Sequence, residues 1–323
     1  MSLPEQVAPG VRRIALPLPI PALRAVNVYL VEGASEWSLV DTGMHTEEAE
    51  RALRAALAAM GIAARDVKSA FVTHLHPDHY GMAGLLEREG TSVVMHRPEA
   101  ERAAGIWAKD GHLIDATYAW FELHGMPPDV NQGMRQGWIA VRGAVEQAEH
   151  LALVDDGATF AMDGREMSVQ WTPGHTDYHA MLFEPGTGTL FAGDHVLPRI
   201  TSNIGLYSFS RDDPLGDFTA SLERAARMPV KRVLPAHGEP FDDLRGRVDE
   251  LLVHHRERLE RVLELMADDQ TAYELSQALF GTLRSPHEER FALAETLAHL
   301  RHLERTGRAF PLETRPVRWR RAA

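Results

Sequence analysis

The chain has 323 residues, of which 44% are hydrophobic and 25% are charged, as expected for a globular protein with one large domain or one large and one small domain. It contains no cysteine, which excludes disulfides, thiolate metal ligands and a cysteine nucleophile, so any metal must be held by nitrogen and oxygen atoms. The net charge is −12, and residues 1–250 hold 22 Lys/Arg against 35 Asp/Glu, which argues against broad contact with a nucleic-acid backbone.

Short β-type runs alternate with helical segments over the first 95 residues. We predict strands over residues 14–18, 27–33, 37–41, 69–74 and 91–96, and helices over 46–61 and 78–90. Thr46 is a candidate N-cap of the first helix, and Asp78 is a candidate N-cap of the second, after Pro77 ends the preceding strand. The N-terminus lacks the layout of a signal peptide, and no stretch approaches the roughly 20 apolar residues that span a bilayer. We therefore expect a soluble cytoplasmic protein without a membrane partner.

Residues 97–150 form a long connection between strands, and we predict that it is mostly helical. It carries three of the six tryptophans, Trp107, Trp120 and Trp138. A connection of this length is usually an insertion with a function. Its aromatic side chains could pack the insertion onto the body, form the contact of a homodimer, or cover the mouth of an active site, and the sequence leaves these alternatives open.

The second half of the chain returns to short strands and then becomes helical. We predict strands over 167–172, 180–184, 189–194 and 231–237, and helices over 213–227, 250–267, 271–280 and 286–306. Thr271 and Glu274 have the spacing of a capping box. The last stretch, 305–323, holds six arginines and one glutamate, and a solvated tail is a simpler interpretation of it than a nucleic-acid arm. We place a domain boundary between residues 1–245 and 246–323.

The most informative stretch is THLHPDHYGMAG, residues 73–84. His74 and His76 alternate at the end of a predicted strand, so both side chains leave on one face. Asp78 and His79 follow the turn at Pro77 and approach from another direction. This pattern favours two neighbouring groups of metal ligands.

Three other strand-end loops offer further ligands. His175 follows a Pro-Gly turn, Asp194 ends a strand, and His237 lies between a strand and a glycine turn. A single histidine at a strand end is more often a hydrogen-bonded structural residue than a ligand. Seven such groups in four loops are harder to explain by packing, because burying so many polar groups is costly unless they have partners.

These residues in this order resemble the metallo-β-lactamase superfamily, and in particular its glyoxalase II-like hydrolases. The resemblance covers about residues 10–240 and includes the DTG motif at 41–43. It implies an α/β fold, an αββα sandwich with two metal ions at one edge. It assigns His74, His76 and His175 to the first metal, Asp78, His79 and His237 to the second, Asp194 to a bridge between them, and Asp41 to the orientation of a ligand.

The chemistry implied by this family is hydrolysis. Two divalent ions roughly 3.5–4 Å apart would hold a bridging hydroxide that attacks a carbonyl or phosphoryl centre, with Asp78 orienting the nucleophile and accepting its proton. Zinc suits hydrolysis without redox chemistry, although iron or manganese would also accept these ligands. The absence of the cysteine found at the second metal in the best-known subclass of β-lactamases argues against antibiotic hydrolysis, and His76 stands where flavin-linked di-iron oxidases carry glutamate.

Substrate contacts are predicted in the excursion after Asp194. Candidates there are His195, Arg199, Asn203 and Tyr207, with Tyr80 beside the metal motif. For Arg199 the alternative is a structural ion pair, and for Tyr207 and Tyr80 it is packing. The helices after residue 246 resemble a winged-helix-like appendage of some members of the superfamily, and we expect His254, His255, His299 and His302 to lie on helix surfaces.

Three functions are compatible with these residues. The first is a hydrolase of a small-molecule thioester, ester or lactone, supported by the complete ligand set and the acidic body. The second is an endonuclease acting on RNA or single-stranded DNA, as in one winged-helix-bearing branch of the superfamily. The third is a metal-binding scaffold without catalytic activity.

Overall fold

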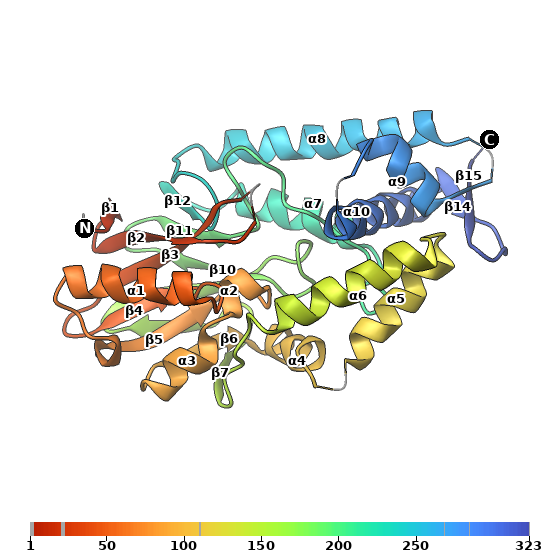
Figure 1. Cartoon of the computed structure of the whole chain (residues 1–323). Helices are drawn as coiled ribbons and strands as arrows, with labels where there is room; N and C mark the ends of the chain where they lie inside the picture. The colour runs from red at the N-terminus through yellow and green to blue at the C-terminus, as the bar shows by residue number, and fades with distance from the viewer. Residues whose placement is uncertain (1–2, 21–22, 110, 268, 284, 323) are drawn as a thin grey trace.

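The computed structural model describes residues 3–20, 23–109, 111–267, 269–283 and 285–322 and shows two β-sheets packed face to face between helices (Figure 1). The first sheet has seven strands in the order β1-β2-β3-β4-β5-β6-β7. Its strands are β1 (Glu5–Ala8), β2 (Val11–Pro17), β3 (Ala25–Glu32), β4 (Trp37–Val40), β5 (Val67–Val72), β6 (Ser92–His96) and β7 (Leu151–Val154). Strands β1 to β4 pair antiparallel, and β4 to β7 pair parallel.

The second sheet has five strands in the order β12-β11-β10-β9-β8. They are β8 (Thr159–Met162), β9 (Arg165–Trp171), β10 (Ala180–Glu184), β11 (Thr189–Gly193) and β12 (Arg232–Pro235), of which β11 and β12 are parallel and the other pairs antiparallel. The facing sides of the two sheets enclose a buried apolar layer. Within it the rings of Tyr29 and Phe191 meet edge to face with centroids 5.7 Å apart. The predicted αββα sandwich is confirmed.

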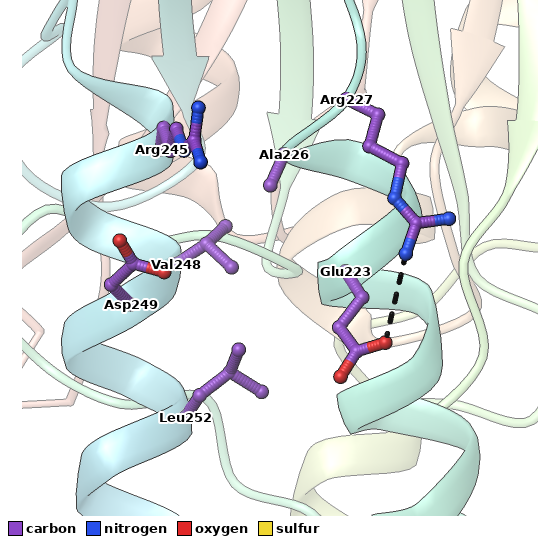
Figure 2. Close-up of a pocket in the computed structure, with 7 residues that line it drawn as sticks. All are labelled: Glu223, Ala226, Arg227, Arg245, Val248, Asp249 and Leu252. Carbon is purple, nitrogen blue, oxygen red and sulfur yellow. Dashed lines mark ion pairs between the residues drawn. The ribbon is translucent and has the colours of Figure 1, made fainter.

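Helices cover the outer face of each sheet. Helix α1 (Glu47–Ala59) buries Leu53 and Leu57 against the first sheet, and Thr46 caps it by accepting a hydrogen bond from the Ala49 amide, as predicted. The short helix η1 (Ala64–Asp66) leads from α1 into β5. Helix α7 (Pro214–Ala225) covers the second sheet. A groove of about 380 Å³ lies between α7 and α8 (Leu244–Leu265) (Figure 2), lined by Glu223, Ala226, Arg227, Arg245, Val248, Asp249 and Leu252.

The helix predicted over 78–90 is divided into α2 (Pro77–Tyr80) and α3 (Ala83–Arg88). The prediction of Asp78 as its N-cap is wrong, because His76 occupies that position and Asp78 lies in the first turn. Gly81 ends α2 where other backbone comes close. A Cβ atom at this position would lie 2.3 Å from the Pro77 carbonyl oxygen and 2.6 Å from the His45 amide.

The insertion between β6 and β7 is helical, as predicted. It consists of α4 (Arg97–Ile106), α5 (His112–Leu123) and α6 (Pro128–Arg142). The rings of Trp107 and Trp138 stack with centroids 4.9 Å apart, which ties α4 to α6. Helix α6 packs against helix α10 (Pro286–Arg305) of the C-terminal region, on the same side of the molecule (Figure 1).

The C-terminal region combines three helices with a small sheet. The helices are α8 (Leu244–Leu265), α9 (Ala272–Phe280) and α10 (Pro286–Arg305), and the sheet has the order β13-β15-β14, with β13 (Gln270–Thr271), β14 (Ala309–Pro311) and β15 (Arg318–Arg321). The capping box of Thr271 and Glu274 is confirmed. The comparison with a winged helix stays a prediction. The expectation that His255 and His299 lie on the surface is wrong, because both are buried between α8 and α10.

Candidate metal centre

Four strand ends bring the predicted ligands to one edge of the sandwich. His74, His76, Asp78 and His79 follow β5, and His175 follows β9. Asp194 follows β11, and His237 follows β12. All seven are buried or half-buried, so the structure brings together every side chain that was predicted to be a ligand, and their role as ligands stays a prediction. Among the described residues, three overlapping groups of these side chains could hold a metal ion.

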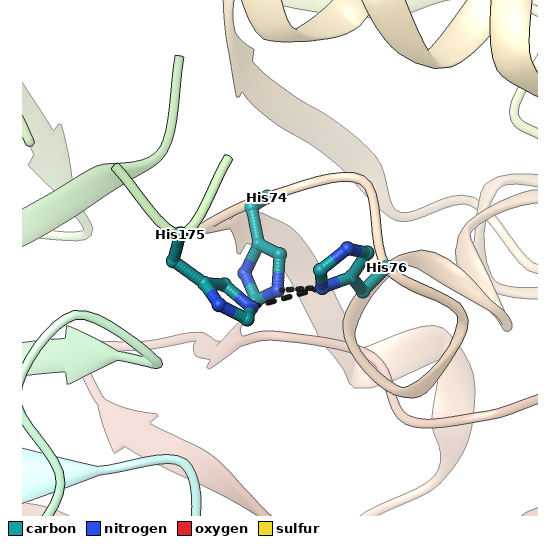
Figure 3. Close-up of side chains that lie close together, drawn as sticks. All are labelled: His74, His76 and His175. Carbon is teal, nitrogen blue, oxygen red and sulfur yellow. Dashed lines mark hydrogen bonds between the residues drawn. The ribbon is translucent and has the colours of Figure 1, made fainter. Parts of the chain in front are cut away.

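The first group consists of His74, His76 and His175 (Figure 3). The Nδ1 atom of His76 lies 3.0 Å from Nε2 of His74 and 2.9 Å from Nε2 of His175. Three ring nitrogens thus converge on one point, an arrangement that suits a cation better than mutual hydrogen bonding. Since His76 presents Nδ1 while the others present Nε2, the group approaches that point from three different directions.

The second group consists of Asp78, His79 and His237. The Oδ2 atom of Asp78 lies 3.7 Å from Nε2 of His79 and 3.3 Å from Nε2 of His237. Asp194 lies between the two groups. Its Oδ2 atom is 3.4 Å from Nε2 of His175, and its Oδ1 atom is 3.7 Å from His79 and 3.5 Å from His237. One carboxylate therefore faces both groups, each with a different oxygen.

Hydrogen bonds to the second ring nitrogen fix the orientation of three histidines. The Nδ1 atom of His79 lies 2.8 Å from Oδ2 of Asp41, that of His175 lies 2.9 Å from the Asn203 carbonyl, and that of His237 lies 2.9 Å from the Ala25 carbonyl. These partners accept only, so Nδ1 carries the proton and Nε2 presents its lone pair to the centre. Asp41 is itself held by the Thr73 amide and hydroxyl, at 2.8 and 2.9 Å.

The polar atoms at the centre match the requirements of a bound cation. Nε2 of His79, Nε2 of His237 and Oδ1 of Asp194 are buried and have no hydrogen-bond partner among the described residues. Burial lowers the pKa of His74, His76 and His175, which favours the neutral imidazole that metals bind. For His79, burial also opposes protonation, but Asp41, Asp78 and Asp194 outweigh it and raise the pKa. The same carboxylates would stabilise a divalent cation.

Comparison with known proteins identifies the family. The sequence profile of the Metallo-beta-lactamase superfamily matches residues 21–237, and that of the metallo-beta-lactamase-like C-terminal domain matches residues 259–321. The chain belongs to the metallo-β-lactamase superfamily. A probable metallo-hydrolase of Bacillus subtilis (strain 168), YqjP, is 30% identical over 303 residues, which cover 90% of this chain and 92% of that protein.

Other similar proteins support this membership of the metallo-β-lactamase superfamily. An acyl-coenzyme A thioesterase of Bos taurus, MBLAC2, is 28% identical over 221 residues, covering 67% of this chain and 74% of that protein. The crystal structure of a metallo-beta-lactamase family protein from Thermus thermophilus has a TM-score of 0.90 at 36% identity and covers 98% of this chain and 100% of that chain. The prediction of a metal-dependent hydrolase is confirmed at the level of the superfamily, whereas the glyoxalase II-like subdivision stays a prediction.

Two buried residues near the candidate metal centre were not predicted from the sequence. His179 accepts a hydrogen bond from the Asp194 amide at Nε2, over 3.3 Å, and its Nδ1 lies 2.8 Å from the Thr172 hydroxyl. Glu99, on α4, is fully buried beside the loops that carry His74, His76 and His175. His179 follows His175 by four residues in the same loop, but nothing in the sequence distinguishes a ligand from a supporting histidine there.

The predicted substrate contacts occupy different environments. Tyr80 is buried in the apolar layer beneath the insertion, where its hydroxyl accepts a hydrogen bond from the Ala148 amide. His195 is also buried, and its Nε2 lies 3.0 Å from the Ser221 hydroxyl of α7. Both side chains have partners within the protein, and substrate contact at these two positions stays a prediction. Arg199 is exposed, and Asn203 and Tyr207 are half-buried; for these three, substrate contact stays a prediction.

The groove between α7 and α8 is separate from the metal centre. None of the residues that line it belongs to the ligand set. It is a surface feature lined by charges of both signs, with Glu223 and Arg227 4.0 Å apart (Figure 2). Within the described parts of the chain, every helix is too short or too polar to span a bilayer.

Proposed function

We propose that this protein is a dinuclear-metal hydrolase that acts on a small molecule with a thioester, ester or lactone bond. The observation that carries the proposal is the position of Asp194, whose two oxygens face two separate groups of ligands. His74, His76 and His175 would hold the first ion. Asp78, His79 and His237 would hold the second, and Asp194 would contribute to both.

Bound divalent ions would supply a water of near-neutral pKa and polarise the carbonyl oxygen of the substrate. The protein's own contribution is to fix the ligands and to move a proton. Asp78 is the carboxylate best placed for proton transfer, because it is half-buried and its Oδ2 lies in the second group. Asp194 faces ligands of both groups, which leaves Asp78 as the proposed proton acceptor.

A thioester is the substrate bond to test first. The relative named acyl-coenzyme A thioesterase supports it, at 28% identity over 67% of this chain. The acidic body of residues 1–250 favours small substrates over a polyanionic backbone. The helical insertion adds aromatic side chains such as Tyr118 and Phe121 to the core between α5 and the C-terminal helices, and this apolar environment lies close to the excursion that carries Tyr207.

Zinc is the proposed metal. Its borderline softness suits imidazole and carboxylate ligands, and it has no redox chemistry to interfere with hydrolysis. Elemental analysis of freshly purified protein is expected to find about two zinc ions per chain. Iron or manganese at comparable stoichiometry would replace zinc in the proposal, since both accept the same ligands.

A substrate panel tests the proposed reaction. Wild-type protein and a His76→Ala control are assayed with zinc on acyl thioesters, lactones, simple esters and labelled RNA. We expect turnover of one of the small-molecule classes, at least 100-fold faster in the wild type. Turnover of RNA alone would favour the endonuclease, and zinc binding without any hydrolysis would favour the non-catalytic scaffold.

A further inference from the structure

The loop that carries His175 is held by helix α4 of the insertion. Thr176 donates a hydrogen bond from its hydroxyl to Oε1 of Glu99 over 2.8 Å. The same oxygen accepts a hydrogen bond of 2.9 Å from the amide of Leu75, which lies between His74 and His76 in sequence. One carboxylate oxygen therefore joins the two loops that supply the first ligand group.

A second contact from α4 reaches the next residue of the same loop. Arg102 donates to Oδ2 of Asp177 over 2.9 Å, and the Arg211 amide donates to Oδ1 of the same carboxylate over 3.0 Å. Asp177 is 9% exposed, so this ion pair is largely shielded from solvent. Helix α4 thus holds two consecutive residues that follow His175.

The C-terminal region holds the same histidine from another side. Nδ1 of His175 donates to the carbonyl of Asn203. The amide nitrogen of the Asn203 side chain donates in turn to Oε2 of Glu295, over 3.0 Å, and to the Phe291 carbonyl, over 3.4 Å. Glu295 and Phe291 both lie on α10, so a chain of two hydrogen bonds links this helix to the ring of His175.

Burying these carboxyl groups has a cost that packing alone does not explain. Glu99 is fully buried, and its Oε2 has no hydrogen-bond partner among the described residues. Burial raises the pKa of Glu99 to about 7 and also raises the pKa of Glu295. An apolar side chain at either position would avoid this desolvation. At position 99 it would leave the Leu75 amide and the Thr176 hydroxyl without this acceptor, and at position 295 it would leave the Asn203 side-chain amide with only the longer bond to the Phe291 carbonyl.

We propose that Glu99 and Glu295 are positioning residues that fix His175 relative to His74 and His76. Through them the helical insertion and the C-terminal region both become part of the metal centre. The inference rests on metal binding by the first ligand group, which belongs to the proposed function, and it does not depend on which substrate is hydrolysed. Partners of this kind typically change metal affinity 10- to 100-fold.

Zinc dissociation constants measured by chelator competition test the proposal. Glu99→Ala and Glu295→Ala are each expected to weaken one of two zinc sites 10- to 100-fold and to leave the other within about twofold. Glu99→Gln and Glu295→Gln keep an acceptor oxygen and should restore most of the affinity. Thr176→Val, which removes a donor but leaves Glu99 in place, should produce a smaller weakening in the same site. Glu101→Ala, at an exposed position of α4, is the matched control.

Cobalt(II) substitution supplies a readout that a general loss of stability would not produce. The visible spectrum of the cobalt-loaded alanine variants should change in band position, because the geometry of one site changes, while Glu101→Ala should keep the wild-type spectrum. Wild-type affinities and spectra in both alanine variants would overturn the proposal, as would equal weakening of both sites. If the wild type binds two zinc ions but hydrolyses nothing in the substrate panel, the proposed function fails while these comparisons still decide the positioning role.

Discussion

At the scale of single residues, the centre depends on side chains that do not themselves reach the metal positions. Asp41 shows this most directly. Its backbone lies in the left-handed region with φ of 63°, which is uncommon for a residue other than glycine. In this conformation its carboxylate accepts hydrogen bonds from the Thr73 amide and hydroxyl and from Nδ1 of His79. Asp41, which lies 38 positions before His79 in the chain, therefore orients the His79 ring of the second ligand group.

We predict that Asp41→Ala weakens zinc binding at the second group 10- to 100-fold, because His79 loses the acceptor that fixes its tautomer and ring orientation. Chelator competition measures this, and the first group should change less than the second. Asp249→Ala, at an exposed position of α8, is the control and should bind zinc as the wild type does. Unchanged affinity in Asp41→Ala would show that the backbone around His79 is sufficient to orient the ring.

The ligand set could be predicted from the sequence because donor residues at strand ends leave a strong local pattern. His74, His76, Asp78 and His79 lie within six positions, and that density has few explanations other than metal binding. Supporting residues leave no comparable pattern. Glu99 is one of two glutamates in PEAER, and only the packing of α4 against the loop of residues 74–76 makes it different from its exposed neighbour Glu101.

At the scale of elements, strands and helices with a buried face were predictable, including the edge strand β12, and the exposed edge strands were not. Strands β3, β10 and β11 are nearly continuous runs of buried, mostly apolar residues, and β5 ends in three of them. Strand β7 (Leu151–Val154) and strand β8 (Thr159–Met162) lie at sheet edges and expose several side chains. Because these short strands bury few side chains, they show no clear alternation of apolar and polar residues. Strand β7 pairs with β6, which lies on the other side of the helical insertion in the sequence, whereas β8 pairs with β9, the next strand in the chain.

The interface between α8 and α10 contains a buried pair of histidines that responds to pH. Nδ1 of His299 donates to the Glu295 carbonyl over 2.8 Å, so its Nε2 is free to accept from Nδ1 of His255, which lies 3.4 Å away. This arrangement requires the His299 ring to be neutral, because its Nε2 acts as the acceptor. Burial lowers the pKa of His299 to about 4. Since the pKa in the unfolded chain is about 6.5, the unfolded state binds more protons between these values, and stability is lost as pH falls from about 6.5 to 4.

We predict that His299→Gln reduces the loss of unfolding free energy between pH 7 and pH 4.5 by about 2 kcal/mol. At pH 7 the variant should itself be less stable by about 1 kcal/mol, because a buried hydrogen bond is lost. Urea unfolding at both pH values, in the presence of a chelator, measures the difference without a contribution from metal binding. His150→Gln changes a side chain that is 88% exposed and should leave the pH dependence unaltered. An unaltered pH dependence in His299→Gln would show that His299 is not buried in its neutral form.

At the scale of the whole molecule, the superfamily domain of residues 21–237 and the C-terminal domain of residues 259–321 share one hydrophobic core. Leu215, Phe218 and Leu222 of α7 belong to the same buried cluster as Leu293 and Leu297 of α10. That cluster also includes residues of β10 and β11 in the second sheet and of α5 in the insertion. The domain boundary at residue 245 stays a prediction, and the apolar packing continues across it.

We predict that residues 1–245 expressed alone do not fold to a stable unit. Each large core side chain that loses its packing lowers the unfolding free energy by about 2–5 kcal/mol. The packing energy lost with α8 and α10 therefore exceeds a typical total stability of about 5–15 kcal/mol. Solubility after expression and the cooperativity of thermal unfolding measure this, and coexpression with residues 246–323 is the matched control that should recover soluble protein. A soluble fragment that unfolds cooperatively and binds two zinc ions would contradict the prediction.

Metal binding should contribute to the stability of the whole molecule because the ligands come from four separate strand ends and can converge only in the folded chain. An ion that binds only the native state adds RT ln(1 + [L]/Kd), or about 4 kcal/mol for one site at a free concentration 1,000 times Kd. We predict that adding zinc to chelator-treated protein raises its unfolding free energy by this amount per site. The increase should be larger at pH 8 than at pH 6, because zinc competes with protons for the imidazoles. Asp194→Ala, which removes the carboxylate facing both groups, should reduce the increase at each pH, and an increase of wild-type size in that variant would mean that Asp194 does not join the two sites.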